Sequence, residues 1–162
     1  MEFKAKTPNV GVASFAKDHF KIEPHSVTIQ VQTIIETSGG EIPVYKADIR
    51  FYRPNSGEYF YLLGCHSAEH LLSTAAYAIY GAKILDLSPM GCMTGFYCTF
   101  LAPELLEYSA WVRIFEDALA IETLPGALPE TCGNYLMHDT ISAKKALREF
   151  LNGYSEELFR VK

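Results

Sequence analysis

The stretch from Gly64 to Tyr80 constrains this chain most, because it predicts an Ala- and Leu-rich helix with two histidines one turn apart. It contains the run His66-Ser67-Ala68-Glu69-His70. His66 and His70 are i,i+4 neighbours on a helix, so both side chains project from one face and can bind one metal ion. Glu69 borders that face, where a carboxylate can move protons without binding the ion. Two bare helix histidines more often hydrogen-bond within a core, but this H-x-x-E-H order is typical of inverted-motif metallohydrolases and favours a metal site.

Length and composition limit the remaining possibilities. At 162 residues the chain can bury a core, and we expect a single domain, 1–162. The net charge of −5 argues against nucleic-acid binding, which requires a basic surface. No apolar run approaches the roughly 20 residues of a membrane span. The polar segment Met1–Val10 lacks the apolar core of a secretory signal. We therefore expect a cytoplasmic protein without a nucleic-acid or membrane partner.

Alternating apolar and polar residues predict strands on both sides of the helix. His25–Ile35 and Val44–Tyr52 alternate in this way around a Thr37–Gly40 turn, which predicts a hairpin with one apolar face. Lys83–Ser88 and Met93–Leu101 predict two more strands. Because the last of these is apolar on both sides, we expect it to be central and covered on both faces.

Two helices are expected in the second half of the chain. Pro103 is suited to a helix start, and the helix should run to about Thr123. Its expected apolar stripe is Leu105, Tyr108, Val112, Phe115 and Leu119. A last helix should begin near Asp139. The order of elements predicts an α+β fold, an antiparallel sheet with helices packed on one face.

The four cysteines are irregularly spaced in a chain without an export signal, which favours free thiols or metal ligands over disulfides. Cys132, beside a glycine in a loop, is accessible as a third metal ligand. Cys65 diverges from the metal face of the helix, and Cys98 lies among aromatic residues, so neither is expected at the ion. Cys92, on a glycine-flanked corner, is either a nucleophile or proton-transfer group activated by a nearby cation, or a buried apolar side chain.

Three segments carry a resemblance to one known family. They are His66–Leu72, Asp86–Tyr97 and Cys132–Tyr135. With Ser14-Phe15, Asp18-His19, Asp48–Phe51 and residues 138–144 they resemble the S-ribosylhomocysteine lyase (LuxS) family over nearly the whole chain. The run Ser-Pro-Met-Gly-Cys-x-Thr-Gly-Phe-Tyr within the second segment is long and specific, whereas the metal motif alone would not be; Met93, at x, departs from the Gln or Arg expected of the family. The resemblance also gives the expected fold its inverted-zincin-like H-x-x-E-H helix.

The resemblance implies a cytoplasmic homodimeric lyase that cleaves the thioether of S-ribosylhomocysteine. The products are homocysteine and 4,5-dihydroxy-2,3-pentanedione, the precursor of the quorum-sensing signal autoinducer-2. It implies one divalent ion, Fe(II), which zinc readily replaces. The implied metal ligands are His66, His70 and Cys132. The implied acid/base pair is Cys92 and Glu69. The implied substrate-binding residues are Ser14, His19, Arg50 and Asp86.

The position of Arg50 gives a geometric reason to expect a shared active site. Arg50 falls on the polar face of its strand, whereas the metal helix should pack on the apolar face. One chain would then struggle to bring Arg50 to its own metal, but a second subunit stacked sheet to sheet could supply it. The arm that carries Ser14 and His19 could reach over a partner in the same way. The alternative is a monomer in which Arg50 is a solvated surface charge.

Two other functions compete with the lyase. In a metallopeptidase with the H-x-x-E-H motif, Glu69 would activate water, but such enzymes use a carboxylate as third ligand and have much longer chains. A non-catalytic metal- or ligand-binding homologue would be indicated by loss of Cys92 or Glu69, and both are present.

Overall fold

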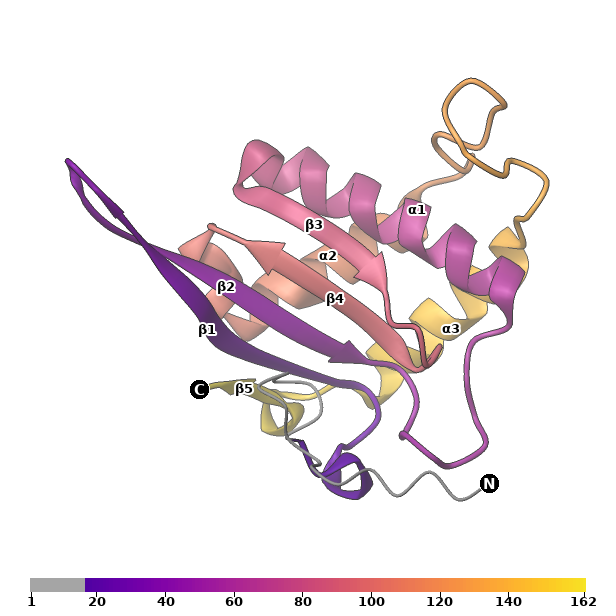
Figure 1. The fold of residues 1–162 in the computed structure, drawn as a ribbon. Helices are drawn as coiled ribbons and strands as arrows, with labels where there is room; N and C mark the ends of the chain where they lie inside the picture. Colours follow the sequence, from indigo (N-terminus) through magenta and orange to yellow (C-terminus); the bar gives the residue numbers. More distant parts are fainter. Residues whose placement is uncertain (1–16) are drawn as a thin grey trace, which may run out of the picture.

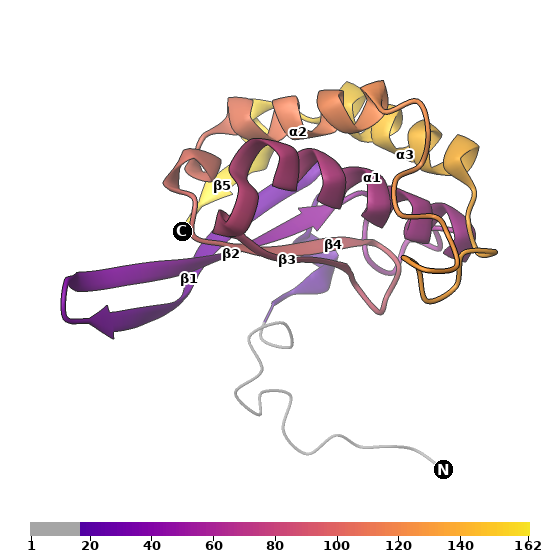
Figure 2. The same cartoon turned by 90° about the horizontal axis from the view of Figure 1, so that it is seen from above.

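The computed structural model describes residues 17–162, which form a five-stranded sheet with three α-helices on one of its faces (Figures 1 and 2). The strands are β1 (Ser26–Thr37), β2 (Gly40–Arg50), β3 (Ile84–Pro89), β4 (Gly95–Phe100) and β5 (Phe159–Val161). The helices are α1 (Leu62–Tyr80), α2 (Tyr108–Ala120) and α3 (Thr140–Gly153). The strand order is β3-β4-β2-β1-β5, and every pairing is antiparallel except that of β1 with β5. This confirms the predicted α+β architecture.

Helix α1 positions one part of the site and has two distinct faces. It ends as predicted at Gly81, whose φ of 55° favours glycine. Its buried face packs toward the sheet and includes Cys65, which was expected to point away from the metal. The histidines lie on the other side and are only half-buried. The helix is therefore fixed by its apolar face and presents its polar face outward.

The prediction that β4 is central is confirmed, but residues 17–162 cover only one of its two faces. The strand is interior, between β3 and β2, and Phe96, Cys98 and Phe100 are fully buried on the helix side. The other face has no helix over it in the described part of the chain (Figure 2), and Tyr97 there is only partly buried. Lys46 Nζ lies 4.1 Å from the centroid of the Tyr97 ring. Tyr97 counts as apolar in the sequence pattern, although its side chain lies on a face that water reaches.

The single helix predicted from Pro103 to about Thr123 is also wrong. Residues Pro103–Leu106 form a 3₁₀ turn, and Glu107 is extended at φ −106° and ψ 137° before α2 begins. The break lets the fully buried Trp111 donate its indole N–H to the Leu105 carbonyl at 2.8 Å. The buried stripe is consequently Ala110, Trp111, Ile114, Phe115 and Ala118. Helix α3 begins as predicted after its N-cap, Asp139, whose carboxylate accepts from the Ser142 amide.

The predicted hairpin is confirmed but extends beyond the sheet. Its outer part, residues 31–44, projects past β4 and β5 (Figure 1). Four apolar side chains on this projection are exposed: Val31, Ile34, Ile35 and Ile42. Among residues 17–162, no helix has the length and hydropathy needed to cross a bilayer.

Candidate active site

Four possible metal donors converge beside the first half of α1. They are His66, His70, Cys132 and His138, and their ligand atoms all lie within 4.8 Å of one another. The first two come from α1, and the other two come from the long loop between α2 and α3 (Figure 1). Thus the structure brings together the three ligands that the resemblance implied and adds His138.

Backbone carbonyls orient the two helix histidines. His66 donates from Nδ1 to the Met137 carbonyl at 2.8 Å, and His70 donates from Nδ1 to the Pro125 carbonyl at 2.7 Å. Because a carbonyl oxygen only accepts, each ring carries its proton on Nδ1 and leaves the Nε2 lone pair free. A hydrogen bond of this kind behind the ring is typical of histidines that bind a metal.

The donor set fits a divalent transition metal. A tetrahedral ion with Zn–N bonds of about 2.1 Å and a Zn–S bond of about 2.3 Å separates nitrogen from sulfur by about 3.6 Å. The His66 Nε2 to Cys132 Sγ distance is 3.5 Å. The two atoms therefore stand at the separation that one shared ion would require. In H-x-x-E-H peptidases the third metal ligand is a carboxylate, so the thiol of Cys132 distinguishes this group from their metal sites.

Sequence reasoning did not identify His138 as part of this group. It follows Cys132 by six residues within an irregular loop, and no spacing rule relates donors in such a loop. Partial burial and the neighbouring His66 and His70 lower the pKa of His138, which favours the neutral form of its ring.

Glu69 lies next to the metal group without belonging to it. Its side chain is half-buried and lines a cavity of about 240 Å³ together with His70 and Gly126. This matches the sequence argument that Glu69 borders the metal face of the helix.

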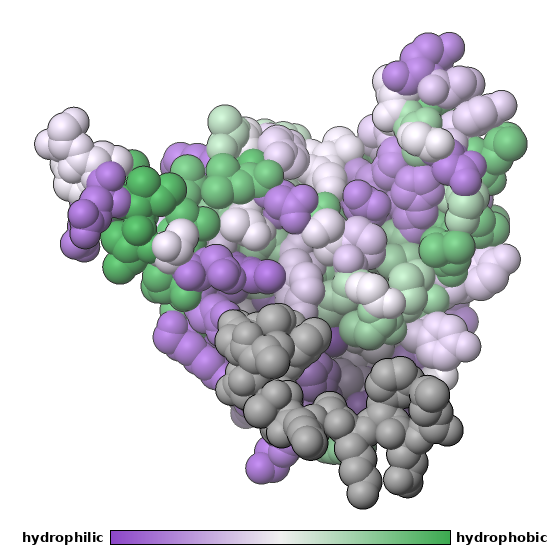
Figure 3. Space-filling view, viewed as in Figure 1, coloured by the Kyte–Doolittle hydropathy of each residue, from purple (hydrophilic) through white to green (hydrophobic). Residues whose placement is uncertain are grey.

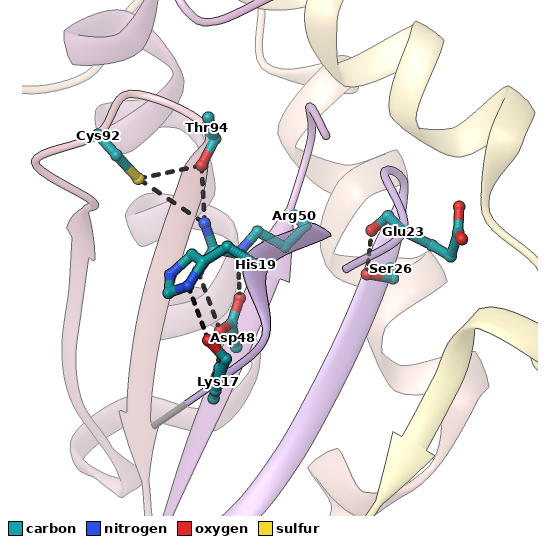
Figure 4. A network of polar contacts seen from close by, with 8 residues as sticks. All are labelled: Lys17, His19, Glu23, Ser26, Asp48, Arg50, Cys92 and Thr94. Carbon is teal, nitrogen blue, oxygen red and sulfur yellow. Dashed lines mark hydrogen bonds and ion pairs between the residues drawn. The ribbon is translucent and has the colours of Figure 1, made fainter. Parts of the chain in front are cut away.

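A second group of reactive residues surrounds Cys92 (Figure 4). Cys92 is exposed on the turn between β3 and β4, and Arg50 Nη1 lies 3.7 Å from its sulfur. The same Nη1 donates to Thr94 Oγ1 at 2.7 Å. Because Thr94 Oγ1 accepts from Arg50, its own proton is free to be donated to the Cys92 sulfur, 3.0 Å away. The sulfur therefore has two donors directed at it.

Arg50 is held rigidly rather than solvated. It is 2% exposed, and its Nε and Nη2 donate to the two oxygens of Asp48 at 2.6 and 3.2 Å. Lys17 donates to the same carboxylate at 2.7 Å. Burial alone would raise the pKa of Asp48, but the hydrogen bonds and charge of Arg50 and Lys17 outweigh it and lower that pKa. The alternative of a solvated surface charge at Arg50 is thereby excluded.

The surroundings of Cys92 favour its thiolate. Partial burial raises the pKa of the thiol, but the hydrogen bonds of Thr94 and the charge of Arg50 outweigh burial, so the pKa lies below its ordinary value. The sequence suggested a bound cation for this effect, whereas within this chain Thr94 and Arg50 lower the pKa of the thiol. Burial instead raises the pKa of Cys98 to about 12.

The remaining predicted residues are placed differently. His19 and Cys92 line one cavity of about 310 Å³, and His19 donates from Nδ1 to the Lys17 carbonyl at 2.9 Å. Asp86 lies apart from the Cys92 group, on β3, where it accepts from the Ser88 hydroxyl at 2.8 Å. Ser14 lies outside the described residues.

The metal group and the Cys92 group are separate within one chain. Across residues 17–162, no hydrogen bond or ion pair joins a member of one group to a member of the other. Arg50 belongs to the helix-free face of the sheet, whereas α1 covers the opposite face (Figure 2). The chain therefore carries two half-sites, one rich in metal donors and one with an activated thiol.

Comparison with known proteins finds matches over a span of the chain that includes both groups. The family model described as S-ribosylhomocysteinase (LuxS) matches residues 12–159. A relative from Dichelobacter nodosus named S-ribosylhomocysteine lyase is 35% identical over 147 residues, 88% of this chain and 91% of the relative. Relatives of the same name from Listeria monocytogenes and Helicobacter pylori are 34% identical over 151 residues and 31% identical over 155 residues. These matches cover 91% and 93% of this chain, and 93% and 96% of the respective relatives.

Proposed function

This chain belongs to the S-ribosylhomocysteinase (LuxS) family, and we infer from that membership that it is an S-ribosylhomocysteine lyase, a carbon–sulfur lyase. The proposed reaction splits the thioether of S-ribosylhomocysteine into homocysteine and 4,5-dihydroxy-2,3-pentanedione, the autoinducer-2 precursor. The observation that carries this conclusion is the family match over residues 12–159, a span that includes both half-sites.

We propose that His66, His70 and Cys132 hold one divalent ion. Their mixed nitrogen and sulfur donors suit both Fe(II) and Zn(II), and we assign Fe(II) to the cell and Zn(II) to replacement during purification. When bound, the ion supplies Lewis acidity for a carbonyl oxygen of the ring-opened sugar. Three protein ligands leave a coordination position open, as catalytic rather than structural sites do.

Cys92 and Glu69 are the proposed proton carriers. The sugar carbonyl must migrate along the carbon chain before homocysteine leaves by β-elimination, so protons must be removed from one carbon and returned to its neighbour. Cys92 is suited to this because it is exposed and its lowered pKa increases the fraction of thiol present as thiolate. Glu69, beside His70, is suited to act from the metal side of the substrate.

The substrate-binding roles rest on two kinds of support. Arg50 and His19 stand beside Cys92, so they are positioned to bind the sugar near the proposed base. The roles of Ser14 and Asp86 rest on the family resemblance alone. We propose that these four residues contact the ribose.

We propose that the enzyme is a homodimer whose active sites form between subunits. Across residues 17–162 no hydrogen bond or ion pair joins the two half-sites, and no helix of that part of the chain covers the face that carries Arg50, so a second copy could pack there. On β2, Ile42 is an even number of residues before Arg50 and so shares its face, and Ile35 is paired with Ile42. Both are exposed, and Figure 3 displays apolar side chains gathered over this hairpin. A paired sheet face in the dimer would bury them.

We assign the enzyme to the cytoplasm. All four cysteines are free, and two of them are buried. Free thiols at both the proposed metal site and the proposed base fit a reducing compartment.

The proposed function is tested by adding S-ribosylhomocysteine to the purified, metal-loaded protein and measuring homocysteine with a thiol reagent. Release of one new thiol per substrate is the expected result, and Cys92→Ala protein is the matched control for background. Substrate binding without thiol release would indicate a non-catalytic homologue. Hydrolysis of a peptide panel in place of thiol release would indicate a metallopeptidase.

A further inference from the structure

His138 is the one member of the metal group that has no assigned role. Its ring stacks on that of His66, with centroids 4.1 Å apart and an interplanar angle of 24°. Its Nε2 lies 3.6 Å from the sulfur of Cys132. It therefore contacts two of the three proposed ligands at once.

A chain of hydrogen bonds leads through Ser67 to Nδ1 of the His138 ring. The Asp139 amide donates to Ser67 Oγ at 2.8 Å, and Ser67 is fully buried. Since the hydroxyl already accepts this bond, its own proton is available to His138 Nδ1, which lies 3.3 Å away. A neutral ring that accepts at Nδ1 carries its proton on Nε2. That N–H is directed at Cys132, whereas the two helix histidines carry their protons on Nδ1 and leave Nε2 free.

The His138 ring packs differently on the two helix histidines. It is stacked on His66 at an interplanar angle of 24°, and it lies edge to face with His70 at 74°. His66 and His70 themselves lie edge to face at 82°. His138 therefore packs against both helix histidines in addition to its contact with Cys132.

We infer that His138 is a positioning residue that donates a hydrogen bond from Nε2 to the Cys132 thiolate and packs against the His66 ligand. This inference rests on the proposed metal-ligand set. A hydrogen bond to a ligating sulfur withdraws electron density from it, and partners of this kind orient the ligands and tune the metal. His138 thereby makes the bound ion a stronger Lewis acid and holds two ligands in place.

Three substitutions separate the hydrogen bond from the stack. The amide nitrogen of His138→Gln can occupy the position of Nε2, so the donor is kept and the ring is lost. His138→Asn has the same functional group, but its amide reaches only the position of Nδ1. It is therefore the matched control that has no donor directed at Cys132. His138→Phe keeps an aromatic ring and removes the donor.

The test uses Co(II)-loaded protein and reads the thiolate-to-cobalt charge-transfer band. All three variants should bind one Co(II) per chain. The band should move to lower energy in His138→Phe and His138→Asn, because a thiolate without its hydrogen bond is a stronger donor, and it should return toward the wild-type position in His138→Gln. Metal affinity should fall about 10- to 100-fold in the two variants without a donor.

Two results would overturn the inference. One is a band that stays at the wild-type energy in all three variants although circular dichroism shows them folded. The other is X-ray absorption of the zinc-loaded protein that counts three imidazoles in the wild type and two in His138→Phe, which would make His138 a ligand. Neither measurement needs substrate, so both decide the role of His138 even if the protein fails to release homocysteine.

Discussion

At the scale of single residues, the reactivity of Cys92 depends on a neighbour that is itself held in place. Asp48 binds Arg50 through two nitrogens, and this leaves Nη1 to face Thr94 and the Cys92 sulfur. The planar, always charged guanidinium can contact three partners at once, which a lysine ammonium on a flexible stem does less well. The strand thus delivers a fixed positive charge to an exposed thiol.

Removing that charge should raise the pKa of Cys92. Because the charge of Arg50 helps lower the pKa of the thiol, Arg50→Gln should shift the pH profile of alkylation by iodoacetamide to higher pH. Arg53→Gln is the control, since Arg53 pairs with Glu23 instead. The buried Cys98, with its pKa raised to about 12, should remain unmodified in the native protein. An unchanged Cys92 profile in Arg50→Gln would refute this account of the thiol.

The two accessible thiols should differ in what their loss does to the metal. Cys132→Ala removes a proposed ligand and should strip the protein of metal, whereas Cys92→Ala should keep one ion per chain and lose turnover. Elemental analysis of the two purified variants, alongside wild type, measures this directly. If the two variants retained equal amounts of metal, the roles of the two cysteines would have to be reassigned.

At the scale of elements, sequence periodicity predicted those parts of the fold in which one apolar face is buried. This holds for α3, whose predicted stripe is the buried one, and for the existence of α1 and the β1–β2 hairpin. In the hairpin the burial departs from the alternation, because Asp48 and Arg50 are buried and Val31 is exposed. The short β5 was not predicted, because it joins the sheet through pairing with β1, far away in sequence. The interruption at Glu107 was also missed, since it depends on the packing of Trp111 against Leu105.

The residues of the site also divide into those that local sequence predicts and those placed by contacts between distant parts of the chain. His66 and His70 could be paired from helical spacing. Cys132 and Cys92 were candidates from their positions beside glycines, and the family resemblance gave each of them a role. The contact between Arg50 and Thr94 joins residues 44 positions apart, so only the pairing of β2 with β4 places them together. His138 was missed for a similar reason, because its position is set by the fold of an irregular loop.

Gly95 is the element-scale feature that allows this pairing. A Cβ at Gly95 would lie 2.0 Å from the Ile49 carbonyl oxygen, so Gly95→Ala must push β4 away from β2. We expect a loss of roughly 1–3 kcal/mol in the free energy of unfolding, the usual cost of overpacking. Urea denaturation measures it. Gly91→Ala, in the same turn but with nothing near its Cβ, is the matched control and should be neutral. Equal stability of the two variants would show that the strands adjust freely.

At the scale of the whole molecule, the sheet separates the two half-sites. The metal group lies with the helices, and Arg50 lies on the helix-free face beside the Cys92 turn (Figures 1 and 4). The residues around Cys92 are already satisfied by contacts within their own chain, as are those around the metal group. In the homodimer proposed above, a two-fold axis would bring the metal half of each subunit to the thiol half of the other, because such an axis makes each contact twice.

Subunit exchange between two inactive variants should therefore restore activity when the two mutations fall in different half-sites. Cys92→Ala keeps the metal half and Cys132→Ala keeps the thiol half, so a mixed dimer contains one intact site. Random exchange should recover about a quarter of wild-type activity, because half of the dimers are mixed and each has one working site of two. Mixing Cys92→Ala with Arg50→Ala is the control and should recover none, since these residues lie 3.7 Å apart within one half-site. Exchange is verified by native mass spectrometry of tagged subunits. If mixed dimers form and the first pair stays inactive, each active site is built from a single chain.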